Sequence, residues 1–322
     1  MYYFIIFKMT TPKVCIIIVN WNGKELLEDC LSSLFKLTDY PNYKVIVVDN
    51  GSTDGSVEFV KKNFPKADVL ALDKNYGFSK GNNIGIKYAL KKYKPKYILL
   101  LNNDTKIIQK DWLTKLVETA ESDEKIGIVG PKLIYPDGRI QHVWTIVNPY
   151  RLQFFITNYK RGEKDSKRFS ILKEVDALCG ACVLIKKEVI EKIGLIDENF
   201  NPFWLEDTDF FIRARDNGFK LIYNGKVKVV HFEGVSTKKY AGRKDLTENK
   251  NVFFIQRRNM LYFLLKHYGI KALLFQLPLI LFDSVFSITY IKPRKDFLSR
   301  VLFVIEETIR QITQHSTSKR KL

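Results

Sequence analysis

The first hundred residues alternate between two hydrophobic patterns, and this alternation limits the folds open to the chain. Runs in which every residue is apolar, typical of strands buried on both faces, occur at Val14–Val19, Val45–Val48, Val69–Leu72 and Ile98–Leu101. Stretches typical of helices lie between them, at Lys24–Phe35, Gly55–Phe64 and Ser79–Tyr93. Strands that alternate with helices predict an α/β fold, with a doubly wound, mostly parallel central sheet and helices on both faces.

Polar residues directly follow each of these four strands. They are Asn20 and Asn22, then Asp49, Asn50 and Asp54, then Asp73 and Asn75, and finally Asn102, Asn103 and Asp104. Asn and Asp are also ordinary turn residues. In this architecture, however, ligands bind outside the carboxyl ends of the strands, so the repetition at four strand ends favours a binding site.

Two common nucleotide-binding motifs are absent from the sequence. No GxGxxG follows the first strand, and GxxxxGK[ST] occurs nowhere in the chain. These absences argue against a dinucleotide-dependent dehydrogenase and against a P-loop NTPase. The carboxylates at the strand ends instead suit a divalent cation that carries a diphosphate.

From about residue 125 the pattern is mixed. We expect strands at Ile126–Val129 and Ala181–Ile185, a hairpin at Pro131–Arg139, a short helix at Lys187–Ile193, and a strand at Lys226–Val230 that leads to His231. Tyr150–Ser170 is polar and basic with little periodicity, and we interpret it as an insertion or acceptor loop.

A dense acidic and aromatic segment spans Trp204–Phe211. We expect an amphipathic helix to begin inside it and to run to Asn217, closed by Gly218. Glu206, Asp207 and Asp209 would repel one another if all three were buried and ionised, so at least one pKa should be raised, as a general base requires. The alternative is a solvated helix start, where acids complement the helix dipole.

The C-terminal part differs in character from the rest. The chain has a net charge of +18, and residues 250–322 carry thirteen Lys and Arg minus four Asp and Glu, or +9. Ala272–Ile291 is strongly apolar but contains Asp283, so we expect it to lie in the interface of an anionic membrane, with a buried helix as the alternative. We expect two domains, at residues 1–232 and 233–322.

The N-terminal segment and the cysteines bear on location. Met1–Lys8 holds only six consecutive apolar residues with no basic residue before them, which is a poor signal peptide. Four cysteines are too few for a disulfide scaffold, which favours a reducing compartment. We therefore expect a cytoplasmic protein, peripheral at the inner face of the cell membrane.

Seven short motifs follow one another within residues 13–235. They are VCIIIVNWNG at 14–23, VVDNGSTDGS at 47–56, NYGFSKGNN at 75–83, LLNNDT at 100–105, GAC at 180–182, EDTD at 206–209, and His231. Together they resemble the GT-A-fold nucleotide-sugar glycosyltransferases of family 2, especially the rhamnosyltransferase-like branch that builds cell-surface polysaccharides. The resemblance implies a Rossmann-like GT-A domain. The helical, membrane-associating extension that follows it is expected from the charge and apolarity of the C-terminal part.

The resemblance also implies a cofactor and roles for the acidic residues. Mg²⁺ or Mn²⁺ would be held by Asp104, in the place of the family's DxD motif, and by His231; here the motif has a single acid, since it is Asn102-Asn103-Asp104. Asp207 would deprotonate the acceptor, Glu206 would orient the acceptor or the base, and Asp209 would be structural.

A further set of residues would bind the nucleotide sugar. The set comprises Val19, Asn20, Asp49, Asp54, Asn75, Gly77, Asn83, Asn102, Asn103 and Arg258. Asp54 has an alternative role as a helix cap. Arg258 belongs to a basic QRRN motif that also suits contact with lipid. Ser236–Asn249 is a candidate lid over the bound donor.

The sequence therefore predicts an inverting glycosyltransferase. It would move a sugar, rhamnose being one candidate, from a nucleoside-diphosphate sugar to a lipid-linked or cell-surface polysaccharide acceptor. A sugar-nucleotide nucleotidyltransferase is the first alternative, although Asn20–Lys24 offers one Gly and one Lys where a triphosphate-gripping loop is expected. Nucleic-acid binding is a weaker alternative, because the positive charge surrounds an apolar tail instead of stacking aromatics.

Overall fold

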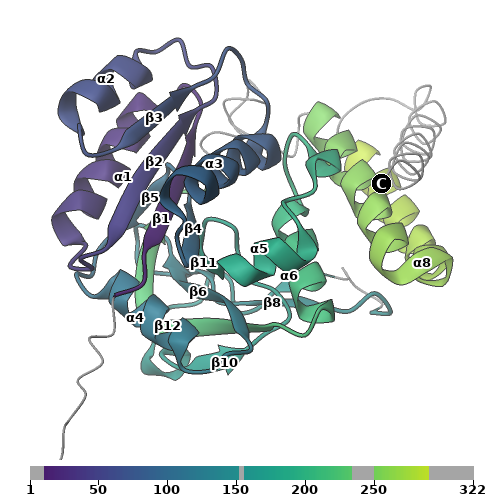
Figure 1. Cartoon of the computed structure of the whole chain (residues 1–322). Coiled ribbons are helices and arrows are strands. Elements are labelled where there is room, and N and C mark those ends of the chain that lie inside the picture. Colours follow the sequence, from purple (N-terminus) through teal and green to yellow (C-terminus); the bar gives the residue numbers. More distant parts are fainter. Residues whose placement is uncertain (1–10, 152–155, 234–249, 290–322) are drawn as a thin grey trace, which may run out of the picture.

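The computed structural model describes residues 11–151, 156–233 and 250–289 (Figure 1). Its strands are β1 Val14–Asn20, β2 Tyr43–Asp49, β3 Asp68–Ala71, β4 Tyr97–Leu101, β5 Thr105–Ile107, β6 Ile126–Ile134, β7 Ile140–His142, β8 Thr145–Val147, β9 Ile156–Asn158, β10 Leu172–Glu174, β11 Cys182–Lys186 and β12 Lys220–His231. Its helices are α1 Lys24–Leu37, α2 Ser56–Asn63, α3 Phe78–Tyr93, α4 Trp112–Glu121, α5 Lys187–Ile193, α6 Glu206–Asp216 and α8 Lys250–Thr289, with 3-10 turns η1 Lys167–Phe169 and η2 Glu198–Phe200.

A ten-stranded, mostly parallel sheet forms the centre of the molecule and confirms the predicted fold class. The strand order is β10-β12-β6-β11-β4-β1-β2-β3, with β5 and β7 attached to β12 and β6. Strands β1 to β4 are parallel, and β11 runs antiparallel between β4 and β6. The carboxyl ends of β1, β2 and β4 therefore lie at one edge, as the sequence predicted.

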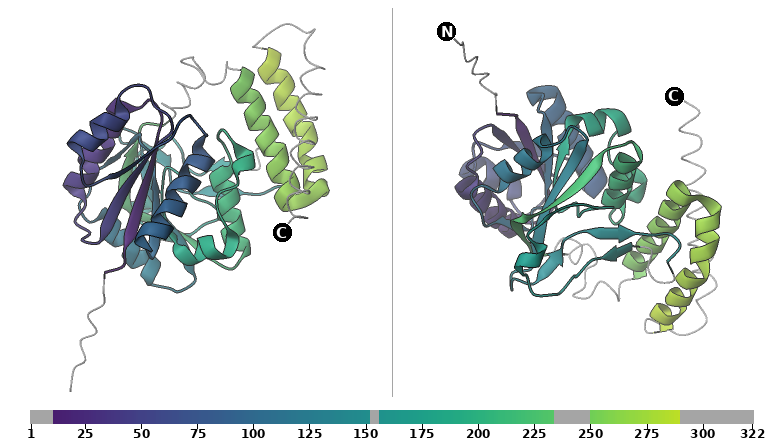
Figure 2. Two further views of the ribbon diagram at one scale, coloured as in Figure 1. Left: turned by 45° about the horizontal axis from the view of Figure 1, so that its top comes forward. Right: turned by 90° about the horizontal axis from the view of Figure 1, so that it is seen from below.

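Helices cover both faces of this sheet (Figures 1 and 2). In β1, Val14, Ile16 and Ile18 enter a core shared with α1, α2 and α4. Cys15 and Ile17 of the same strand enter a second core, shared with α3, α5 and α6. Because successive side chains alternate between the faces, a strand between two helical layers must be apolar at every position, which explains the uninterrupted apolar runs.

The middle of the chain differs from the sequence-based expectation in two places. The expected strand at Ile126–Val129 and the first half of the expected hairpin form one continuous strand, β6, which pairs with β7. Pro131 lies inside β6, where the pairing with β12 is irregular between Asn224 and Lys228. The expected loop at Tyr150–Ser170 is partly regular, since β9 pairs with β8 and η1 follows. Strands of three residues are too short to show a period in the sequence.

The kinked helix α8 packs against residues of η2 and α6. Gly269, with φ of 72°, separates two helical arms that lie side by side (Figure 2). Met260–Leu264 are buried against Phe200, Leu205 and Ile212. The boundary at residue 232 stays a prediction. Ser236–Asn249 and the last two residues of Ala272–Ile291 lie outside the described residues. Within the described part of the chain, no helix combines the length and apolarity needed to cross a membrane.

Candidate active site

A chain of polar side chains joins the ends of β4, β1 and β2. Asn103 Nδ2 donates to Asn20 Oδ1 at 2.8 Å, and Asn20 Nδ2 donates to Asp49 Oδ2 at 3.0 Å. Asp49 Oδ1 accepts from the backbone N–H of Ser52 at 2.8 Å, and all three chain residues are buried. Strand-end residues from three separate parts of the sequence thus form one buried chain of hydrogen bonds, and its amide and carboxylate groups are of the kind that pair with a base or ribose.

The loop after β3 is held next to this surface by a second asparagine. Asn50 Nδ2 donates to Asn75 Oδ1 at 3.0 Å and to the carbonyl of Gly77 at 3.1 Å. Gly77 has φ of 84°, and a Cβ there would lie 2.6 Å from Asn201 Oδ1. Glycine is therefore required at this position for two reasons, its backbone conformation and the close approach of Asn201.

The other residues predicted to contact the nucleotide have different partners in the structure. Asp54 accepts from the backbone N–H groups of Lys24 and Ser56, at the starts of α1 and α2. These contacts are those of a helix cap, the alternative role considered for Asp54. Asn83 is buried, and its amide exchanges hydrogen bonds with the backbone of Ile196. Val19 contacts α3 at the position of Gly81, and Asn102 is half-buried at the end of β4.

Asp104 and His231 meet because β5 pairs antiparallel with β12, which places His231 opposite Thr105. Asp104 Oδ1 lies 3.1 Å from His231 Nε2, and both side chains are about 6% exposed. Gln141 Oε1 lies 3.3 Å from His231 Nδ1. Gln141 Oε1 can accept a proton from Nδ1, and the tautomer protonated there leaves the Nε2 lone pair available for a metal ion.

This pair fits a divalent cation. Among the described residues, neither Asp104 Oδ1 nor His231 Nε2 has a hydrogen-bond partner, although both atoms are buried. Two buried acceptors that face each other are costly unless a cation or proton lies with them. No group of three or more His, Cys, Asp and Glu is found in the described ranges, so the protein offers two ligands here. Mg²⁺ is commonly held by one or two side chains, with phosphate oxygens and waters as the other ligands.

Asp207 lies in the first turn of α6 and is anchored to the segment that precedes β11, next to the end of β4. Its Oδ2 accepts from the backbone N–H of Gly180 at 2.9 Å, and Ala181 accepts from the N–H of Asn102 at the end of β4. Burial raises the pKa of the Asp207 carboxyl, while the N–H groups of Gly180 and Thr208 oppose that rise. A raised pKa under a fixed hydrogen bond suits a carboxylate that accepts a proton near neutral pH.

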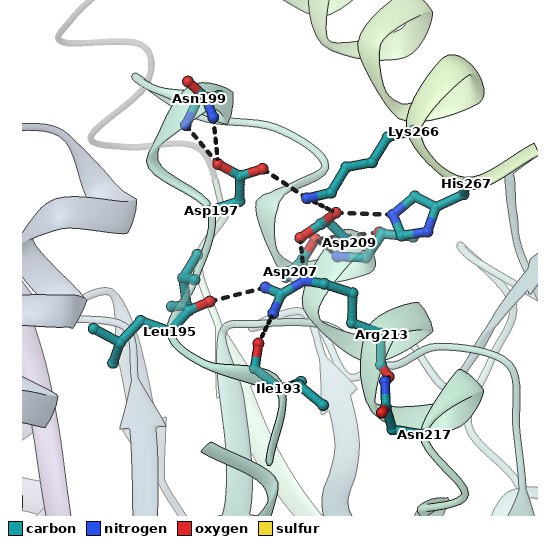
Figure 3. A network of polar contacts seen from close by, with 12 residues as sticks. Ile193, Leu195, Asp197, Asn199, Asp207, Asp209, Arg213, Asn217, Lys266 and His267 are labelled. Carbon is teal, nitrogen blue, oxygen red and sulfur yellow. Dashed lines mark hydrogen bonds and ion pairs between the residues drawn. The ribbon is translucent and has the colours of Figure 1, made fainter. Parts of the chain in front are cut away.

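The three acids of α6 have different electrostatic surroundings. Burial and the neighbouring Asp207 raise the pKa of Glu206 well above its usual value. Burial alone would raise the pKa of Asp209 too, but a hydrogen bond from His267 and the charges of Arg213 and Lys266 hold it well below its usual range. Figure 3 shows Lys266 and His267 reaching from α8 to Asp209, with Nζ–Oδ1 and Nε2–Oδ1 distances of 2.6 and 2.8 Å. Asp209 is thus neutralised by cations from α6 and α8, and its structural role stays a prediction.

Replacing Glu206 by glutamine is expected to raise the melting temperature most at high pH. A raised carboxyl pKa contributes stability below the unfolded-state pKa, and this contribution is lost as the pH rises through the folded-state pKa. Glutamine cannot ionise, so the variant should gain about 2 °C over wild type at pH 8 and little at pH 4. Melting curves across this range test it, with the exposed Glu118→Gln as control. A pH-independent difference would contradict it.

Several functional candidates were not predicted from the sequence. Gln141 orients His231, Ser52 binds Asn20 and Asn22, and Lys266 with His267 neutralises Asp209. Arg258, predicted to bind the donor, donates from Nε to Asn259 Oδ1 at 3.0 Å and from Nη2 to the carbonyl of Asn201. The QRRN motif was the signal for this region, but the partners of its side chains depend on how α8 packs.

The fold is of the GT-A type, as two solved structures show. S. aureus TarS 1-349 in complex with UDP-GlcNAc matches 93% of this chain and 81% of that chain, with a TM-score of 0.56 and 16% identity. GalNAc-T7 with UDP, GalNAc and Mn²⁺ matches 69% of this chain and 43% of that one, with a TM-score of 0.55 and 17% identity. Similarity at this level of identity shows the fold alone.

The chain belongs to glycosyl transferase family 2, whose sequence model matches residues 15–194. It is 28% identical over 236 residues to the O-antigen biosynthesis protein RfbC of Myxococcus xanthus, covering 70% of this chain but 18% of that protein. It is 25% identical to the dTDP-rhamnosyl transferase RfbF of Shigella flexneri, covering 81% and 87%. It is 22% identical to the N-acetylglucosaminyl-diphospho-decaprenol L-rhamnosyltransferase of Mycobacterium tuberculosis, covering 70% and 78%. These relatives confirm the resemblance to the rhamnosyltransferase-like branch.

Proposed function

We propose that this glycosyltransferase is an inverting, Mg²⁺- or Mn²⁺-dependent enzyme that transfers a sugar, rhamnose being the first candidate, to a lipid-linked or cell-surface polysaccharide acceptor. The carrying observation is the position of Asp207, fixed by Gly180 next to the strand end that leads to Asp104. A base at Asp207 and a cation held by Asp104 and His231 suit a displacement in which a diphosphate leaves and a hydroxyl attacks.

The donor would lie along the buried polar chain of Asn103, Asn20 and Asp49. Asp104 and His231 would hold the divalent cation, which neutralises charge on the departing nucleoside diphosphate. The loop held by Asn50 would close the other side of the nucleotide, with Gly77 allowing close backbone contact.

Asp207 would accept the proton of the acceptor hydroxyl. The hydroxyl oxygen forms a bond to the anomeric carbon on the face opposite the diphosphate, and the carbon–oxygen bond to the diphosphate breaks with its electron pair on the leaving group. The anomeric configuration therefore inverts in one displacement. Glu206, whose raised pKa favours its protonated form, can donate a hydrogen bond to the acceptor or to Asp207.

A nucleoside-diphosphate sugar together with Mn²⁺ is expected to raise the melting temperature of the protein. A ligand at about 100 times its Kd stabilises the folded state by about 2.7 kcal/mol. The screen compares dTDP-rhamnose, UDP-sugars and nucleoside triphosphates, each with Mn²⁺ or with EDTA. Strong stabilisation by triphosphates alone, with pyrophosphate release from a sugar phosphate, would favour the nucleotidyltransferase alternative instead.

The membrane-contact proposal rests on an apolar patch on α8. Ile270 and Leu274 are 58% and 59% exposed, and Phe275 packs edge-on against the exposed Tyr150 at 5.9 Å between ring centroids. Lys271 is exposed within the same turn. Apolar side chains with a neighbouring lysine suit an anionic lipid surface, which would bring the enzyme to a lipid-linked acceptor at the inner face of the cell membrane.

Introducing glutamate at both Ile270 and Leu274 is expected to weaken binding to anionic vesicles by at least about tenfold, because two apolar contacts are lost and two like charges are added. Flotation with phosphatidylglycerol-containing vesicles measures this. The matched control is a double glutamate variant at Ile171 and Leu172, which are exposed apolar residues around β10. Equal loss in both variants, or tighter binding to RNA than to vesicles, would contradict the proposal.

A further inference from the structure

The segment before α6 has a backbone conformation that its own residues disfavour. Trp204 and Leu205 have φ of 85° and 73°. Two consecutive residues other than glycine thus have a backbone in the left-handed region. Such a conformation persists only where the surrounding structure imposes it. Glu206 and Asp207 follow immediately, so whatever holds residues 200–205 also sets the position of the catalytic carboxylates.

Asn259 of α8 supplies the strongest attachment of this segment. Its Nδ2 donates to the backbone carbonyls of Phe200, Phe203 and Trp204 at 2.8, 2.9 and 2.9 Å. Its Oδ1 accepts from Arg258 Nε at 3.0 Å, and the side chain has no exposed surface. The two N–H bonds of this amide serve three converging carbonyls, so one hydrogen is shared between two of them. A carboxylate would repel these carbonyls, and an apolar residue would leave them without this donor.

The opposite side of the segment contacts the donor loop. Asn201 Nδ2 donates to the carbonyl of Tyr76 at 3.2 Å, and the N–H of Phe78 donates to the carbonyl of Pro202 at 3.3 Å. Gly77 lies directly against Asn201. Residues 200–205 therefore lie between the loop assigned to the nucleotide and helix α8, with contacts to both.

We infer that Asn259 is a positioning residue for sugar transfer. It holds residues 200–204 so that α6 begins with Asp207 under the N–H of Gly180, and it makes α8 a required part of the active site. This inference rests on the proposed role of Asp207 as the base. Lys266 and His267, about two turns further along α8, contact α6 as well, through Asp209.

Replacing Asn259 by alanine is expected to lower kcat about 100-fold, since a displacement of about 1 Å in a catalytic group has effects of this size. Binding of a nucleoside diphosphate with Mn²⁺, measured by calorimetry, should change little. The matched control is Asn224→Ala, which removes another buried amide, bound to Thr119 and Lys115, and should cost similar thermal stability but leave kcat near wild type.

A spectroscopic measurement separates positioning from general destabilisation. With 5-fluorotryptophan incorporated, the ¹⁹F signal of Trp204 should shift or broaden in the variant, while that of the buried Trp112 stays in place. Asn259→Asp, which keeps the side-chain shape, provides the same test if the alanine variant does not fold. An unchanged kcat with an unmoved Trp204 signal would overturn the inference, and so would equal losses of kcat in the Asn224 control. Sugar transfer that survives Asp207→Asn, in a protein that keeps Asn259, would instead refute the proposed function. The Trp204 signal of the Asn259 variants would still test the attachment.

Discussion

Replacing Asp207 by asparagine is expected to lower kcat by about 10²–10⁴-fold, the range associated with loss of a general base. Asparagine has nearly the same shape and its side-chain oxygen can still accept from Gly180 N–H, so the start of α6 should stay in place. The amide cannot take the acceptor proton. Because the proposed donor contacts lie at the ends of β1, β2 and β4, binding of the nucleotide sugar should be retained.

The decisive comparison is with a carboxylate on the same helix. Asp216 ends α6 and its side chain is 57% exposed, so Asp216→Asn changes the same chemical group away from the site. Steady-state rates with the donor and acceptor, together with donor affinity by calorimetry, distinguish loss of chemistry from loss of binding. Turnover near the wild-type rate in the Asp207 variant would remove it as the base.

The second large effect is expected at Asp104 and His231, the proposed ligands of the divalent cation. Asp104→Asn should lower kcat about 10³-fold and abolish the dependence of donor binding on Mn²⁺, since a metal contributes several kcal/mol to stabilising charge in the transition state. His231→Ala should act similarly. The two changes together should cost little more than either alone, because both remove the same bound cation.

Manganese binding can be measured without turnover. Titration of Mn²⁺ in the presence of a nucleoside diphosphate, followed by electron paramagnetic resonance, should show bound metal in wild type and much weaker binding in Asp104→Asn. Asp111→Asn, at the exposed start of α4, is the control. Equal manganese affinity in all three proteins would show that Asp104 does not hold the metal.

The sequence predicted the first four strands and the three helices between them because their cause is local. A strand covered on both faces must be apolar throughout, and a helix packed on one face must be amphipathic, so each element has a recognisable hydrophobic pattern in the sequence. The start of α6 was predicted for the same reason. The short strands β8 and β9 were not, since three residues show no period and their pairing depends on contacts such as Trp144 on Tyr159.

The candidate site divides in the same way. The sequence by itself determined which polar residues follow which strands, and hence that they meet, because the ends of parallel strands share one edge whatever the details of packing. Only the tertiary structure decided that His231 faces Asp104 with Gln141 behind it, and that Asn259 holds the segment before Asp207. These contacts join residues far apart in the chain, through the register of β5 on β12 and the packing of α8, and no local pattern of residues encodes either.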